Sequence, residues 1–76
     1  MPQDRDGNEL RYQEIVAVPD FLLNGERRPY VQGRFILQQV RGPKKGQLLI
    51  EINRVEVYVP RQRVVAWRAF TPKGGD

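Results

Sequence analysis

Apolar and polar residues alternate along most of this chain with the period of two that is typical of β-strands. Between residues 10 and 70 the sequence is rich in Val, Ile, Tyr and Phe and is interrupted by Gly, Pro and Asn, with no helical stripe. The pattern predicts one all-β domain over residues 10–70. Residues 1–9, which are polar and include Pro2 and Gly7, are expected to be a flexible leader, and residues 71–76 a flexible tail.

The clearest local signal is a change of parity between two short apolar runs, whose alternating positions are Leu48, Ile50 and Ile52, then Val55, Val57 and Val59. A continuous strand cannot change faces without a bulge, whereas a hairpin with a two-residue turn at Asn53-Arg54 does so naturally. We expect that hairpin rather than a bent single strand. It would place three pairs on one buried face: Ile52 with Val55, Ile50 with Val57, and Leu48 with Val59.

The remaining strands are bounded by turn residues. A first strand is expected over Leu10–Val18, ending at Pro19, and residues 20–25 are either its continuation or a single helical turn. Residues 26–29 are expected to be a charged loop. A long strand over Tyr30–Arg41 should place Val31, Phe35 and Leu37 on one face with Gly33, and a glycine inside a strand indicates a bulge or sharp bend.

A tight turn over Pro60–Arg63, of the 3₁₀ type, and a last strand over Val64–Phe70 complete the set. Five short strands with brief connections predict a small five-stranded SH3-like or Sm-like barrel, closed or partly open. The alternative is a three-stranded sheet with an irregular N-terminal part.

The inventory of reactive side chains argues against an enzyme. The chain has no Cys, His or Ser, and Thr71 is its one threonine, so the usual nucleophiles and the usual general base are missing. Glu51 and Glu56 stand among basic residues and are expected to be solvated strand positions. The glycines of residues 42–46 lack the Gly-Lys-Ser/Thr ending of a phosphate-binding loop. We therefore expect no catalytic residues, no metal site and no cofactor.

Charge is distributed unevenly along the chain. Residues 1–26 carry six acids and two bases, a net of −4, whereas residues 27–76 carry eleven bases and three acids, a net of +8. Such asymmetry indicates a polyanionic partner, although a solvated surface with internal ion pairs would give the same counts.

Basic residues also alternate with aromatic ones, and ten of the thirteen bases are arginine. Arginine pairs with phosphates and stacks on bases, and single strands bind where a positive groove meets aromatic side chains. Tyr58 should be exposed because it lies opposite the Val55/Val57/Val59 face, while Phe35 is expected in the core. The candidate nucleic-acid-binding residues are Arg27, Arg28, Arg34, Arg41, Lys44, Lys45, Tyr58, Arg61, Arg63 and Arg68.

The order of elements resembles the Sm-like family (Sm, Lsm and the bacterial Hfq group) over about residues 12–70. The matching features are Leu23-Asn24-Gly25 ahead of Gly33, the hairpin over residues 47–59, and the tight turn at Pro60–Arg63. The resemblance implies an open five-stranded barrel that joins edge to edge into rings and binds single-stranded RNA. It would place Asn24, Arg61 and Arg63 near an RNA-binding pore.

These observations predict a small nucleic-acid-binding module for single-stranded RNA or DNA. The alternative is a non-catalytic adaptor that binds an acidic protein surface, with Ile36, Leu49, Phe21 and Leu22 as a docking patch. No apolar run is long enough to span a membrane and residues 1–6 are not a signal peptide, so a cytoplasmic protein without a membrane partner is expected. The open barrel edges favour a homo-oligomer.

Overall fold

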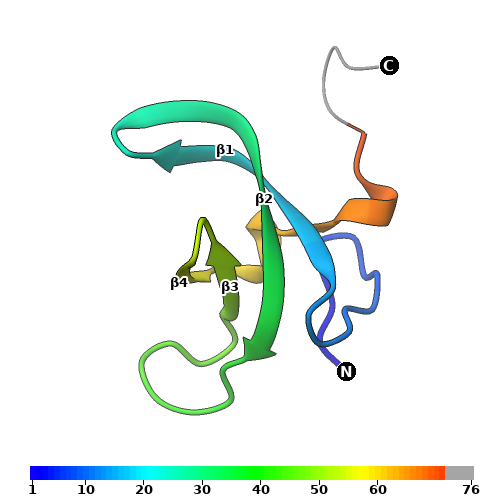
Figure 1. The fold of residues 1–76 in the computed structure, drawn as a ribbon. Helices are drawn as coiled ribbons and strands as arrows, with labels where there is room; N and C mark the ends of the chain where they lie inside the picture. Colours follow the sequence, from blue (N-terminus) through cyan, green and yellow to red (C-terminus); the bar gives the residue numbers. More distant parts are fainter. Residues whose placement is uncertain (72–76) are drawn as a thin grey trace.

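Residues 1–71 are described by a computed structural model in which five antiparallel strands form one sheet in the order β4-β3-β2-β1-β5. The strands are β1 (Ile15–Leu23), β2 (Glu26–Gln38), β3 (Leu48–Ile52), β4 (Val55–Val59) and β5 (Val65–Ala66), and two 3₁₀ turns, η1 (Arg61–Arg63) and η2 (Trp67–Ala69), flank β5. The sheet is strongly bent (Figure 1), but its outer strands, β4 and β5, do not pair. The predicted all-β class is confirmed, and in the described residues the sheet is open rather than closed into a barrel.

β1 and β2 form a long hairpin whose turn is Asn24-Gly25. Both turn residues have positive φ, 52° and 80°, which Asn-Gly adopts more readily than any other pair. The strand therefore continues past Pro19, and the expected end at that residue is wrong. Pro19 is tolerated because β5 pairs only with Val16 and Ala17, so this part of β1 is an edge.

The same hairpin decides the neighbouring segments. Of the two alternatives for residues 20–25, continuation of the strand is confirmed for residues 20–23, whereas residues 26–29, expected to be a loop, pair with β1 as the beginning of β2. At the other end, β1 begins at Ile15 and not at Leu10. The helical-turn alternative would make Gly25 a C-cap, whereas in the structure Asn24-Gly25 is the two-residue turn of the hairpin.

The β3–β4 hairpin is confirmed in its register. Ile52 pairs with Val55, Ile50 with Val57 and Leu48 with Val59, and the two turn residues have φ values of 54° (Asn53) and 67° (Arg54). The common buried face is only partly confirmed. The β3 members and Val59 are buried, but Val55 is 59% exposed and Val57 is half-buried because β4 is the outer strand.

The bend of β2 is centred on a buried glycine. A Cβ atom at Gly33 would lie 2.4 Å from Cγ2 of Ile50 and 3.1 Å from the carbonyl oxygen of Glu51. Only glycine therefore lets β2 cross β3 this closely. A bulge between Phe35 and Leu37 then shifts the register, so Phe35 is buried as expected while Leu37, expected on the same face, is 42% exposed.

The C-terminal part keeps the expected 3₁₀ turn at Arg61–Arg63 but not the long last strand. β5 has two residues, and the chain then turns through η2, so the expected strand over Val64–Phe70 is wrong. This turn brings Trp67 and Phe70 against Tyr30 of β2, with ring centroids 5.7 Å and 5.2 Å from that of Tyr30. The aromatic contacts offset the loss of strand pairing.

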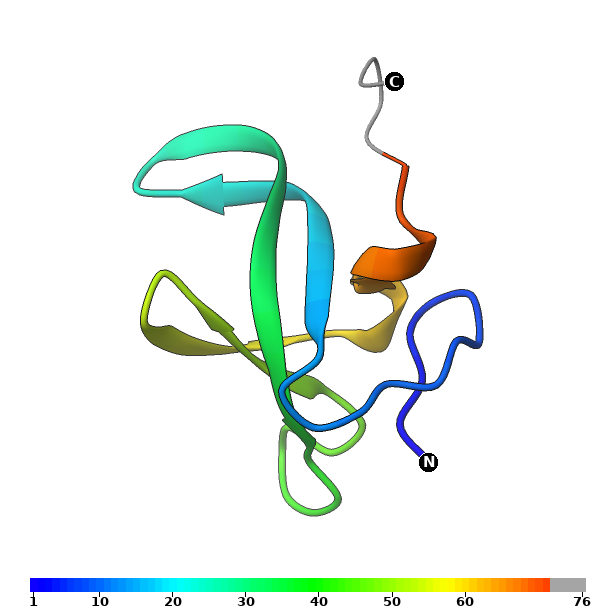
Figure 2. The same ribbon diagram turned by 45° about the vertical axis from the view of Figure 1, so that its right-hand side comes forward.

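The N-terminal residues are part of the fold, which corrects the expectation of a flexible leader over residues 1–9. Asp4 is fully buried. Its Oδ2 accepts hydrogen bonds from the backbone N–H of Ala66 (2.7 Å) and from Nδ2 of Asn8 (3.1 Å), and its Oδ1 accepts from the N–H groups of Asp6 (2.9 Å) and Asn8 (2.8 Å). Figure 2 shows this segment, in dark blue, beside the β5–η2 region.

Leu10 completes the N-terminal contribution, because its side chain is 1% exposed and packs into the core. The core otherwise consists of side chains from every strand: Val16, Val18, Val31, Phe35, Leu48, Ile50, Ile52, Val59, Val64 and Ala66.

Among the described residues, no helix has both the length and the apolar character needed to cross a membrane. The expected tail at residues 72–76 lies outside the described residues.

Replacing Asp4 tests the N-terminal anchor. Burial raises the pKa of Asp4, but the hydrogen bonds from Ala66, Asn8 and Asp6 outweigh it and the net pKa is lowered from 3.8. A carboxyl group whose pKa is lowered by folding stabilises the folded state at pH values above the pKa of the unfolded state. This stability is lost as the pH falls through the pKa of the folded state. Urea unfolding should therefore show a loss of stability below about pH 4 that is smaller in Asp4→Asn.

At neutral pH, Asp4→Asn should lower the free energy of unfolding by about 2–4 kcal/mol, because an amide has one acceptor oxygen and would direct its N–H₂ group at existing donors. Asp6→Asn, the same charge change at an exposed residue, is the control and should cost less than about 0.5 kcal/mol. Equal effects of the two substitutions would contradict the anchoring role.

Gly33→Ala tests the close crossing of β2 and β3. The variant should lose about 1–3 kcal/mol of stability because the new methyl group overlaps Ile50. Ile50→Ala removes that neighbour and alone should cost about 2–5 kcal/mol. In a double-mutant cycle by chemical denaturation, the double variant should lose less than the sum of the two single losses. Strict additivity would mean that this contact does not cause the bend.

Candidate nucleic-acid interface

The loop between β2 and β3, residues 41–46, gathers positive charge without any acid. It contains Arg41, Lys44 and Lys45, and all of its residues are exposed. Two glycines with left-handed φ, Gly42 (82°) and Gly46 (88°), bend the chain. Backbone hydrogen bonds close it, from Lys45 N–H to the Gly42 carbonyl (3.0 Å) and from Gly46 N–H to the Gln39 carbonyl (2.8 Å). We call this segment the basic loop.

Tyr58 of β4 lies directly beside the basic loop. Its side chain is 38% exposed, as expected from its parity, and Nζ of Lys44 stands 5.9 Å from the centre of its ring. This distance is within the range of a cation–π contact. The Tyr58 hydroxyl donates a hydrogen bond to Oε1 of Gln39 (3.2 Å), and Nε2 of Gln39 donates to the carbonyl of Arg41 (3.1 Å). Gln39 thus joins the ring to the loop.

The surface next to Tyr58 is apolar. Across the sheet Tyr58 pairs with Leu49, and Leu49 pairs with Leu37, so the three side chains lie in one row on the outer face. The bulge after Phe35 is what turns Leu37 to this side. An exposed ring with apolar neighbours, one cation over it and two more cations in the adjacent loop can accept a flat, negatively charged ligand.

Five of the ten residues expected to bind nucleic acid form ion pairs or hydrogen bonds with other residues of the protein. Arg27 pairs with Asp20 (2.9 Å), and Arg28 pairs with Glu26 (3.2 Å). The others donate to backbone carbonyls: Arg61 to Asp4 (2.8 Å), Arg63 to Asp20 (2.9 Å), and Arg68 to Glu9 (2.7 Å), with a second contact from Arg68 to Glu14. The internal pairing of the acidic and basic parts of the chain explains much of the charge asymmetry.

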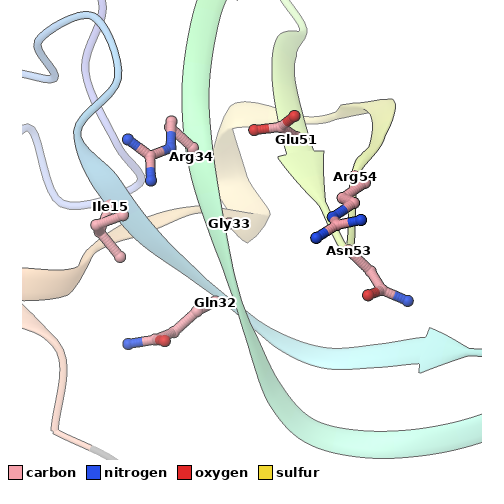
Figure 3. A pocket seen from close by; sticks show the side chains of 7 residues that line it. All are labelled: Ile15, Gln32, Gly33, Arg34, Glu51, Asn53 and Arg54. Atoms are coloured by element: carbon pink, nitrogen blue, oxygen red, sulfur yellow. The ribbon is translucent and has the colours of Figure 1, made fainter.

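Arg34 lies apart from the basic loop, on the outer face near the β3–β4 turn. It lines a shallow concavity of about 390 Å³ together with Gln32, Glu51 and Arg54. Figure 3 shows the carboxylate of Glu51 between the guanidinium groups of Arg34 and Arg54. The mixture of charges makes this concavity a weaker anion site than the basic loop.

The apolar residues considered for a docking patch do not form one surface. Phe21 and Leu22 line a hollow at the β3–β4 turn with Val55, whereas Ile36 lines a different hollow with Met1 and Tyr12. Leu49 belongs to the row beside Tyr58. Leu37 connects this row to the hollow that contains Ile36, so the four residues lie in two places rather than in a single patch.

Sequence reasoning missed the roles of two residues. Gln39 was read as a strand residue, and nothing local in the sequence indicates that its amide bridges Tyr58 and Arg41. Arg54 was considered only as a turn residue, and it lines the separate concavity that contains Arg34 and Glu51. In residues 1–71 no cluster of three or more metal-ligating side chains occurs. No protein-family model, curated protein or solved structure matches the chain.

Replacing Arg61 and Arg41 separately tests whether the first stabilises the fold while the second does not. Arg61→Ala should lower the free energy of unfolding by about 1–3 kcal/mol, because it removes a partly buried donor to the Asp4 carbonyl. Arg41→Ala removes the same charge from the exposed loop and should change stability by less than about 0.5 kcal/mol. Thermal melts of both variants make the comparison. Equal melting temperatures would show that the Arg61 hydrogen bond adds nothing.

Proposed function

We propose that this protein binds single-stranded nucleic acid on its outer sheet face, with Tyr58 as the stacking surface and the basic loop as the phosphate-binding element. The observation that carries the proposal is the placement of Lys44 over the exposed ring of Tyr58, in a loop that also contains Arg41 and Lys45. These three cations have no acidic partner among the described residues. Their charge is therefore available to an external anion.

The geometry suits a single strand better than a duplex. A base stacks on an aromatic face only when it is not already stacked inside a helix, and such stacking tolerates any sequence. The Gln39 hydrogen bonds hold the ring beside the loop, so a base on Tyr58 would have its phosphates near Arg41 and Lys45. Lys44 has a flexible stem, which lets it move from the ring to a phosphate.

A finer fold assignment is part of the same proposal. The bent five-stranded sheet, the two-residue hairpin turn and the 3₁₀ turn before the last strand support an Sm-like or SH3-like relationship. Architecture of this kind is shared by proteins of unrelated function. The function therefore depends on the Tyr58 site and not on the fold.

Salt-dependent binding tests the proposal. Fluorescence polarisation with labelled single strands should give a log–log salt slope of about −2 if three cations each neutralise a phosphate. Arg41→Ala combined with Lys45→Ala should reduce that slope by about 1.4. Tyr58→Leu should weaken binding by about 1–3 kcal/mol with an unchanged slope, because stacking releases no counterions.

Arg27→Ala combined with Arg28→Ala is the charge-matched control. These residues lie beside the Asn24-Gly25 turn, at the opposite end of β2 from the basic loop (Figure 1), and are engaged with Asp20 and Glu26. The control should retain the parent slope. If both double variants lose affinity equally, net charge and not this site is responsible. An absence of binding at low salt would instead favour an acidic protein partner.

A further inference from the structure

The outer edge of β4 carries backbone groups that no described residue uses. In a hairpin with a two-residue turn the residues next to the turn exchange hydrogen bonds, and the pattern then alternates along the strand. Val55, Val57 and Val59 therefore direct their N–H and C=O groups to β3, and Glu56 and Tyr58 direct theirs outward. Within residues 1–71 neither Glu56 nor Tyr58 has a strand or turn partner on that side.

Apart from its short length and the charge of Glu56, this edge lacks the features that usually prevent pairing between chains. Protective edges carry proline, lysine or a bulge, or are covered by another segment. β4 has no proline and no lysine, its pairing with β3 is regular over all five residues, and Val55 is 59% exposed. An exposed, regular and largely apolar edge is suited to receive another strand.

The negative charge of Glu56 at this edge is not balanced by a cation of the described residues. Glu56 lies directly opposite Glu51, and like charges at opposed positions destabilise a hairpin. Glu51 has Arg34 as its neighbour on β2, but Glu56 has no cation within ion-pair distance among the described residues. A positive group brought beside Glu56 would remove this repulsion.

We propose that two copies of this protein associate through their β4 edges as an antiparallel, two-fold symmetric pair centred on Val57. In this register Glu56 of one copy faces Tyr58 of the other. Both residues direct their backbone groups outward, so each such pair exchanges two hydrogen bonds, and symmetry supplies a second pair. Val57 faces its own counterpart at the centre, and the two sheets become one.

Pairing centred on Val57 is favoured over pairing centred on Glu56 or on Tyr58, for reasons of charge and of hydrogen bonding. Centring the pair on Glu56 would oppose the two Glu56 side chains, which repel. Centring it on Tyr58 would oppose Glu56 to Pro60, which has no N–H to donate. In the proposed register Lys44 stands over Tyr58 and hence beside Glu56 of the other copy. Opposed side chains lie on the same face of a sheet, about 5 Å apart, so both copies gain an ion pair.

The association has a consequence for the outer face. Because the two-fold axis is perpendicular to the sheet, both Tyr58 rings would lie on the same side, with their Cα atoms about 8 Å apart from strand spacing and rise. The inference itself rests on the β4 edge and not on nucleic-acid binding. It is tested with protein alone.

Sedimentation equilibrium between about 5 and 500 µM should show a monomer–dimer equilibrium. Lys44→Glu and Glu56→Lys should each weaken dimerisation about tenfold or more, and the double swap should restore it. Glu56→Lys should meanwhile raise the melting temperature of the monomer, because it replaces the Glu51–Glu56 repulsion by attraction. Opposite effects on stability and association distinguish the interface from a folding defect.

Two further variants complete the test. Glu56→Pro removes an outward N–H that the monomer does not use, so it should abolish the dimer while the circular dichroism spectrum stays that of a folded sheet. Glu9→Lys, the same charge change at an exposed N-terminal residue, should dimerise like the parent. A monomer throughout the concentration series would overturn the proposal, as would a dimer that survives Glu56→Pro or a charge swap that fails to restore association.

Discussion

The contact between Gly33 and Ile50 is the constraint around which this fold is arranged. A small sheet can enclose a core only if it bends over itself, and the bend requires two strands to cross closely. Any side chain larger than hydrogen at residue 33 would overlap Ile50 and the β3 backbone. With glycine there, β2 curves, and the inner faces of β1 and β3 enclose Val16, Phe35 and Ile50. The bulge that follows delivers Leu37 to the outside.

Bending leaves one side of the core uncovered, and the N-terminal segment covers it. Asp4 is what fixes this segment, because its carboxylate satisfies the N–H of Ala66 in the short strand β5 while Leu10 enters the core. A buried carboxylate is costly unless its oxygens are hydrogen-bonded, and here both oxygens are. Arg61 adds a bond to the Asp4 carbonyl, so arginine is used to hold the chain together.

The sequence predicted what depends on local pattern and missed what depends on distant partners. The β3–β4 register followed from a parity change around Asn53-Arg54, and the buried Phe35 from alternation. The role of Asp4 could not be predicted, because its decisive donor, Ala66, is 62 positions away. The same holds for Gln39, whose amide meets Tyr58 only after β4 returns beside the basic loop. The sequence left two alternatives open beyond Pro19, because the length of β5, which makes that position an edge, is a tertiary property.

The arginine residues likewise cannot be interpreted without their distant partners. Arginine was expected to signal a polyanion wherever it clustered, yet its five donors serve equally well to satisfy carbonyls and carboxylates of the protein, and half of the candidate residues do so. What separates the basic loop is the absence of any acid or carbonyl within reach of its side chains among the described residues. Positive charge that the fold does not use, placed beside a ring that Gln39 holds in position, is a more specific indication of a ligand than net charge. The outer face of β3 and β4 is therefore where function should be sought.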